Sequence, residues 1–398
     1  MDNIDLDTIS SPSGRLGGAA GIYIHIPFCK QACFYCDFHF STSLKKKDEL
    51  IDALISEIEL RYPILNREVV ETIYFGGGTP SMLSNIELQK IIDAVYTRFQ
   101  VCENPEITLE ANPDDLSLER IKTLAEETKI NRLSIGIQSF FNDDLKSMNR
   151  AHNATEAEKC LKEATKCFDN ITIDLIYGIP NMSLEKWNDN LEKAFSFGVN
   201  HISSYALTVE PKTALDTFIE KGKYPPIDED LALKHFNHLV EKTSEKGFVH
   251  YEISNFGKPN FFSKHNTSYW LGKSYLGIGP SAHSFYNNQR SWNVSNNAKY
   301  IKSIQNKELP LSTENLTKQD AFNEHVMTGL RTIWGVSFNK IKTEFGDGFL
   351  QYLKKNSNKF INEDLLAIET NSHNESVLVT TKKGKFLVDG IAAELFMI

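Results

Sequence analysis

Three of the chain's six cysteines, Cys29, Cys33 and Cys36, lie within eight residues, in the segment C-K-Q-A-C-F-Y-C. Thiols at such short spacing are typical of metal or iron–sulfur ligands, which usually come in sets of four. Three cysteines therefore either borrow a ligand or leave one coordination position open. The spacing allows a zinc site completed by His25 or His39, but it favours an iron–sulfur cluster, because the second ligand pair of zinc folds is missing.

A glycine-rich turn offers a ligand site beside these cysteines. The turn G-G-G-T-P, residues 76–80, follows the strand-like run T-I-Y-F. Glycine lets the backbone come close to a ligand, and Thr79 adds a hydroxyl, although a tight strand-to-helix turn would use the same residues. Following a cysteine triplet, the turn indicates a cofactor site.

Six β-rich runs alternate with amphipathic helical stretches between Gly21 and about Ile202. The runs are G-I-Y-I-H-I, T-I-Y-F, E-I-T-L-E-A, R-L-S-I-G-I, I-T-I-D-L-I-Y-G-I and H-I-S-S-Y-A-L. The alternation predicts parallel β/α units. Because a closed eight-stranded barrel would need two more units, we predict an α/β fold with a partial (β/α)6 barrel.

The predicted domains follow changes in this pattern. Residues 1–20 are polar and rich in Ser and Gly, which predicts a flexible leader, and residues 21–210 form the partial barrel core. Residues 211–315 are predicted as a helical and loop extension. Residues 316–398 combine short helices with two strand-like runs, which indicates a small C-terminal winged-helix-like α+β domain.

Composition excludes several classes of partner. The net charge of −9 provides no general attraction to nucleic acid, so no nucleic-acid partner is predicted. K-K-G-K is the only basic run in the C-terminal tail that would support a winged-helix nucleic-acid binder. No apolar run is long enough to span a bilayer, and no signal peptide is evident. We therefore expect a cytoplasmic protein, in which a cysteine triplet indicates metal binding rather than disulfides.

The polar residues gather where the predicted strands end. The cysteine triplet follows the first strand and G-G-G-T-P the second, while Glu110, Gln138, Asp174 and Tyr205 lie in or just after the next four. Taken singly, each has a structural explanation, such as an ion pair or a helix cap. Because the carboxyl ends of parallel strands share one edge, the set predicts one common site.

The chain resembles radical S-adenosylmethionine (SAM) proteins of the oxygen-independent coproporphyrinogen III oxidase superfamily. Six ordered motifs carry the resemblance: Y-I-H-I-P-F-C-x3-C-x-Y-C, G-G-G-T-P, L-E-A-N-P, R-L-S-I-G-I-Q-S-F, M-N-R-A-H and I-D-L-I-Y-G-I-P. It extends over almost the whole chain from Gly21. The resemblance implies that Cys29, Cys33 and Cys36 hold three irons of a [4Fe-4S] cluster and that SAM occupies the open position on the fourth.

The same resemblance assigns roles to the strand-end residues. Arg150 would pair with the SAM carboxylate, Asp174 would accept hydrogen bonds from the ribose, and Ala206 would touch the adenosine. The other expected SAM contacts are Tyr23, Tyr35, Gly77, Gly78, Thr79, Glu110 and Gln138.

Two features place the chain nearest to the HemW haem chaperones of this superfamily. The oxidases have a fourth cysteine two residues after the third, where this chain has Phe38. The chaperones carry an H-N-x-x-Y-W motif, present here as His265–Trp270. An imidazole can ligate haem iron and aromatic faces can cover a porphyrin, so His265 is the predicted haem ligand and His283 a second candidate. Without the resemblance, a capped turn with a buried Trp270 would explain the motif.

Two functions therefore compete. The first is a haem chaperone that binds the cluster, SAM and haem, and transfers haem to haemoproteins such as membrane-bound respiratory enzymes; haem binding could produce a homodimer. The second is an oxygen-independent coproporphyrinogen III oxidase, which forms protoporphyrinogen IX by oxidative decarboxylation. Phe38 and H-N-T-S-Y-W favour the chaperone, and whether SAM is cleaved stays open.

Overall fold

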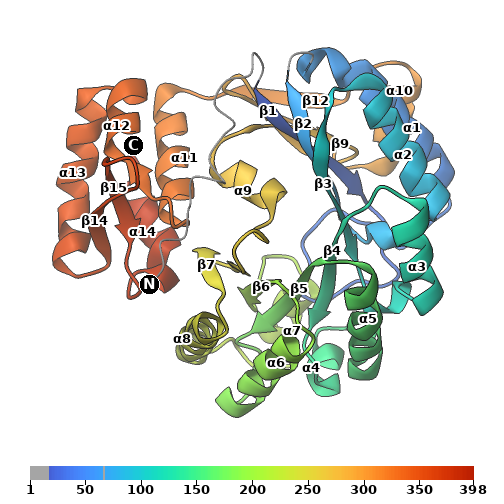
Figure 1. Ribbon diagram of the computed structural model, residues 1–398, viewed down its shortest axis with the longest axis horizontal. Helices are drawn as coiled ribbons and strands as arrows, with labels where there is room; N and C mark the ends of the chain where they lie inside the picture. Colours follow the sequence, from blue (N-terminus) through green and yellow to red (C-terminus); the bar gives the residue numbers. More distant parts are fainter. Residues whose placement is uncertain (1–17, 66–67) are drawn as a thin grey trace.

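The computed structural model describes residues 18–65 and 68–398 (Figure 1). The predicted flexible leader, residues 1–20, falls outside the described residues as far as residue 17, and Ala19 and Ala20 already belong to the first strand. Among the described residues, no helix has the length and apolar character needed to cross a membrane.

A large, mostly parallel sheet is the centre of the molecule. In the described part of the chain it has twelve strands in the order β12-β11-β10-β9-β1-β2-β3-β4-β5-β6-β8-β7. The six predicted strands are β1 (Ala19–Ile26), β2 (Val69–Gly77), β3 (Val101–Ala111), β4 (Arg132–Gln138), β5 (Asn170–Tyr177) and β6 (His201–Ala206). They pair in parallel and in chain order, which confirms the α/β class and the run of β/α units.

Helices cover the outer side of the curved sheet (Figure 1). They are α1 (Lys47–Arg61), α2 (Asn85–Arg98), α3 (Leu118–Glu127), α4 (Asn142–Ser147), α5 (Ala154–Cys167) and α6 (Leu184–Ser196). Every residue of β4 is buried, and Leu133, Ile135 and Ile137 alternate along it with polar residues, so one face of the strand is apolar and the other carries polar side chains. The sheet remains open, with β12 and β7 at its two edges.

Residues 211–315, predicted as a helical and loop extension, also supply strands to this sheet. The elements are α7 (Ala214–Glu220), α8 (Glu229–Glu245), β7 (Val249–Glu252), β8 (Asn255–Gly257), α9 (Lys264–Trp270), β9 (Ser274–Ile278), β10 (His283–Tyr286), β11 (Gln289–Asn293), α10 (Asn297–Gln305) and β12 (Leu311–Asn315). Strand β9 pairs in parallel with β1, and β10 to β12 continue the sheet in antiparallel pairing. The segment is therefore part of the sheet as well as a linker.

The C-terminal part has its own apolar core and a three-stranded antiparallel sheet. Its elements are α11 (Lys318–Leu330), β13 (Val336–Ser337), α12 (Phe338–Lys340), η5 (Ile341–Phe345), α13 (Asp347–Asn362), β14 (Leu366–Thr370), β15 (Ser376–Thr380) and α14 (Val388–Glu394). An ion pair from Arg331 to Glu252 of β7, 3.0 Å long, joins this part to the large sheet.

Candidate cofactor sites

The three predicted cluster ligands share one loop between β1 and α1. The main-chain N–H of Cys29 donates to the carbonyl of Ser41 over 3.1 Å, and that of Cys36 donates to the carbonyl of Cys33 over 3.3 Å. Burial raises the pKa of the Cys36 thiol to about 11, and the neighbouring Cys33 and Cys29 add to the shift. Thiols crowded in this way become stable thiolates only beside positive charge, which iron provides.

Two side chains from other elements contact the thiols. Thr79 Oγ1 donates to Cys29 Sγ over 3.5 Å, and Arg150 Nη1 donates to Cys33 Sγ over 3.4 Å. Arg150 also donates to Tyr35 Oη over 3.4 Å. These contacts bring two predicted site residues, Thr79 and Arg150, to the cysteine loop, and the donor set fits an anionic iron–thiolate cluster.

The imidazoles of the alternative zinc site have other partners. His25 Nε2 hydrogen-bonds the carbonyl oxygen of His39 at 3.0 Å, and His39 Nε2 hydrogen-bonds Asn297 Oδ1 at 2.7 Å. In residues 18–65 and 68–398, no three His, Cys, Asp or Glu side chains converge on one ion position. A cubane does not need such convergence, because each thiolate binds a different iron. The geometry thus fits a cluster better than a single zinc ion.

Asn112 is a residue that the sequence analysis missed. Its Nδ2 donates to Thr79 Oγ1 over 3.2 Å, and its Oδ1 accepts a 2.6 Å hydrogen bond from Arg150 Nη2. Arg150 Nη2 also donates to the carbonyl of Gly136 over 3.0 Å, while its Nε is buried and unpaired among the described residues. Asn112 therefore links the glycine-rich turn to the arginine; its place in L-E-A-N-P, after β3, was the available signal.

The glycines of G-G-G-T-P are first of all required by packing. Gly77 has a φ of 105°, and a Cβ there would lie 2.4 Å from His25 Cε1. A Cβ on Gly78 would lie 2.6 Å from the carbonyl oxygen of Phe28. Both distances are impossible for a side chain, so the turn is pressed against the start of the cysteine loop and its polar groups are held beside the thiols.

Two half-buried carboxyl groups lie beside each other on the inner side of the sheet. Glu110, at the end of β3, accepts hydrogen bonds from Tyr74 Oη at 2.8 Å and from the N–H of Gly77 at 3.2 Å. Burial raises the pKa of Glu110 to about 7, and the nearby Asp174 carboxyl raises it further. Burial also raises the pKa of Asp174 to about 6, against the attraction of Arg132 and Arg150. Their charges change near neutral pH, as is common at functional sites.

The remaining predicted residues lie around this edge at greater separation. Tyr23 Oη hydrogen-bonds His25 Nδ1 at 3.2 Å. Gln138 ends β4 with a φ of 65°, an unusual conformation for a residue other than glycine. Ala206 ends β6 and is half-buried. Among the described residues, no hydrogen bond joins these three side chains to the thiols.

The H-N-T-S-Y-W motif forms helix α9, capped by Ser263, whose side chain accepts from the N–H of Asn266. His265 is only 1% exposed, and both of its ring nitrogens have partners. Nδ1 hydrogen-bonds Thr72 Oγ1 at 2.7 Å, and Nε2 hydrogen-bonds Tyr269 Oη at 2.6 Å. Iron ligation by His265 would break one of these bonds, so in this conformation the histidine orients Tyr269.

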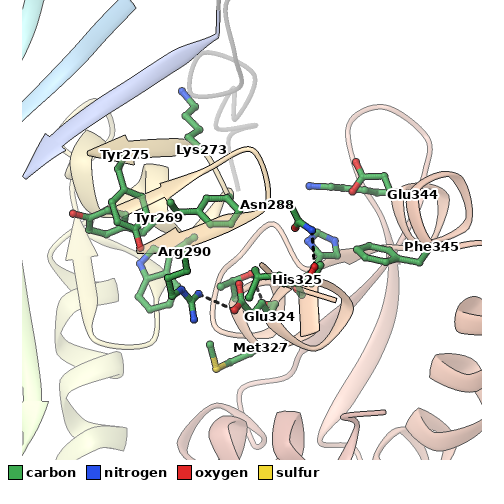
Figure 2. A pocket seen from close by; sticks show the side chains of 17 residues that line it. Tyr269, Lys273, Tyr275, Asn288, Arg290, Glu324, His325, Met327, Glu344 and Phe345 are labelled. Carbon is green, nitrogen blue, oxygen red and sulfur yellow. Dashed lines mark hydrogen bonds and ion pairs between the residues drawn. The ribbon is translucent and has the colours of Figure 1, made fainter. Parts of the chain in front are cut away.

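A pocket of about 290 Å³ lies beside the end of this motif (Figure 2). Tyr269 and Trp270 of α9 line it, together with residues of the β9–β11 region and of α11. The second predicted haem ligand, His283, does not line it; His283 is exposed on β10, with its ring stacked 5.8 Å from that of Trp292. The aromatic part of the motif, and not its histidine, therefore lines this pocket.

Two family models match the chain. The Radical SAM superfamily model matches residues 23–194, and the HemN C-terminal domain model matches residues 316–387. The chain is 34% identical over 375 residues to the heme chaperone HemW of Bacillus subtilis (strain 168), which covers 92% of this chain and 96% of that relative. The chain belongs to the HemW family. The heme chaperone HemW of Lactococcus lactis subsp. lactis (strain IL1403) is also 34% identical, over 86% of this chain and 90% of its own length.

The fold is shared beyond the HemW family. The solved structure of coproporphyrinogen III oxidase (HemN) from Escherichia coli superposes with a TM-score of 0.82 at 21% identity, over 97% of this chain and 92% of that one. At this identity the match shows the common architecture only, so HemW and the oxidase must be distinguished at the level of the site.

Proposed function

We propose that this protein is a haem chaperone that binds a [4Fe-4S] cluster, SAM and haem, and transfers haem to haemoproteins. The observation that carries the proposal is the identity of 34% with a heme chaperone over 92% of the chain. The proposed location is the cytoplasm. The proposed recipients are haemoproteins, including membrane-bound respiratory enzymes, and haem binding is proposed to favour a homodimer.

The proposed binding of the cluster and SAM rests on the cysteine loop and the strand ends. Cys29, Cys33 and Cys36 would hold the cluster, and Arg150, fixed by Asn112, would meet the SAM carboxylate. When bound, the cluster and SAM supply one-electron chemistry that no side chain provides. The other proposed SAM contacts are Tyr23, Tyr35, Gly77, Gly78, Thr79, Glu110, Gln138, Asp174 and Ala206.

The proposed binding of haem rests on the aromatic residues of α9. Tyr269 and Trp270 line the pocket, and aromatic faces pack well against an apolar macrocycle. His265, predicted from the sequence as an iron ligand, supports this surface instead through its bond to Tyr269.

Phe38 argues against the oxidase activity. It occupies the position where the oxidases have a fourth cysteine, and its side chain is 67% exposed beside the cluster loop. A phenylalanine supplies neither a thiolate ligand nor an acid or base.

The deciding experiment uses protein isolated without oxygen and loaded with haem. We expect one molecule of haem to bind per chain and to move to an apo-haemoprotein, followed by the change in Soret absorption. With SAM, a reductant and coproporphyrinogen III, we expect no protoporphyrinogen IX. Formation of that product at enzymatic rates would replace the chaperone with the oxidase, and failure to bind haem at all would end the proposal.

A further inference from the structure

The pocket beside α9 is formed by two parts of the chain that are far apart in sequence. Tyr275 of β9 and Arg290 of β11 line it from the large sheet, and His325 and Phe345 line it from the C-terminal part. Figure 2 shows Tyr269, Tyr275 and Arg290 on one side, Phe345 and Glu344 on the other, and Glu324 and His325 between them. An ion pair of 2.7 Å from Arg290 to Glu324 joins the two sides.

His325 is the one pocket histidine, and its bonding is incomplete. Its Nε2 atom is buried and has no hydrogen-bond partner among the described residues. Its ring is stacked on Phe345, with 6.3 Å between the ring centres and an interplanar angle of 26°. A buried polar atom without a partner costs free energy, and a ligand that reached this nitrogen would remove that cost.

The electrostatic surroundings keep this imidazole in the form that binds metals. Burial lowers the pKa of His325 to about 4, and the charge of Lys340 lowers it further. A neutral ring at pH 7 presents a free lone pair on one nitrogen, which is what iron ligation needs.

The other walls suit a flat apolar ring system that carries carboxylates. Tyr269, Trp270, Tyr275 and Phe285 supply aromatic surface. Lys340 also lines the pocket, and among the described residues it forms no ion pair. Its ammonium group is therefore available to a propionate.

The volume fits a carrier better than a permanent haem site. About 290 Å³ lies just below the range of about 300–1,000 Å³ for small-molecule pockets. Part of a porphyrin disc enters such a space, while the opposite edge stays outside and accessible to a recipient.

We propose that His325 is an axial iron ligand of a haem bound between the large sheet and the C-terminal part, with Tyr269 and Trp270 against the ring and Lys340 toward a propionate. This inference rests on the proposed haem-binding function and adds the site and the ligand. It moves the iron contact from H-N-T-S-Y-W to α11.

The test compares hemin binding by wild type, His325→Ala and the matched control His283→Ala, with the full-length protein kept free of oxygen. We expect His325→Ala to lose the spectrum of imidazole-ligated iron and to bind hemin about ten- to a hundredfold more weakly. Added imidazole should restore the spectrum, and His283→Ala should match wild type. Metal-free protoporphyrin IX should bind wild type and His325→Ala equally, because only the iron contact is lost.

Each outcome separates the ligand assignment from the function. If wild type binds and transfers hemin but His325→Ala has the same spectrum and affinity, the ligand assignment is wrong and the chaperone function survives. If wild type does not bind hemin, both fail. Thermal unfolding of each variant shows whether it folds, and His325→Gln, which keeps a polar side chain of similar size but has no imidazole, repeats the test should the alanine variant unfold.

Discussion

Replacing Glu110 with Gln should change how the stability of the cofactor-free protein depends on pH. Burial raises the pKa of Glu110 from 4.5 to about 7, so the folded protein holds this proton more tightly than the unfolded chain does. The resulting stabilisation is complete below pH 4.5 and is lost as the pH rises through about 7. At about 1.4 kcal/mol per pH unit, the loss amounts to about 3 kcal/mol in the free energy of unfolding.

The substitution removes this dependence because an amide does not ionise. Urea unfolding, followed by tryptophan fluorescence without oxygen, gives the free energy of unfolding of both proteins at several pH values. Relative to wild type, Glu110→Gln should gain about 2–3 kcal/mol between about pH 5 and about pH 8, whatever constant cost the new amide causes beside Tyr74 and Gly77. The exposed control Glu119→Gln on α3 should show no such trend. A difference between Glu110→Gln and wild type that is the same at every pH would refute the reasoning.

The remaining predictions concern the cysteine loop and its supports. Cys33→Ala should abolish the visible absorption of the anaerobically isolated protein, whereas Cys160→Ala, in the core of α5, should keep it; zinc without iron or sulfide in the wild type would contradict the cluster. Arg150→Lys should weaken SAM binding in equilibrium dialysis by about tenfold while iron stays bound, because lysine cannot form the paired charge-assisted hydrogen bonds of a guanidinium group. Unchanged affinity for SAM would remove Arg150 from the proposed SAM site. Gly78→Ala should lower the free energy of unfolding by about 1–3 kcal/mol because the new Cβ has no room. Gly348→Ala should not lower it, because open space surrounds Gly348. Equal stabilities of the two variants would show that the backbone of the turn can shift at little cost.

The sequence was a good guide to the strands that are buried on both faces. Runs such as R-L-S-I-G-I are β-rich and continuous, and each appears as a parallel strand at the predicted place. Strand β9 was missed because S-Y-L-G-I is short and contains a glycine. The structure gives the reason for that glycine: a Cβ on Gly277 would lie 2.0 Å from the carbonyl oxygen of His283.

The site was predictable in its position but not in its bonding. The carboxyl ends of parallel strands had to meet, so a common edge for Glu110 and Asp174 followed from the topology, whereas Arg150 came only from the family resemblance. The hydrogen bond of His265 to Thr72 did not, because Thr72 is 193 residues away along the chain and no local pattern encodes that bond. For the same reason the hydrogen bond from Asn112 to Thr79 could not be predicted from the sequence.

The parallel pairing of β1 with β9 also has a consequence for biosynthesis. Ile24 pairs with Ile278, so the strand that leads into the cysteine loop waits for a partner made about 250 residues later, or about 13–50 s at about 5–20 residues per second. Until then one edge of β1 is open to wrong pairing on the ribosome. Iron–sulfur loading should therefore follow translation of β9: ribosome-arrested chains that end before β9 should remain colourless under loading conditions, and those that extend beyond α10 should take up iron.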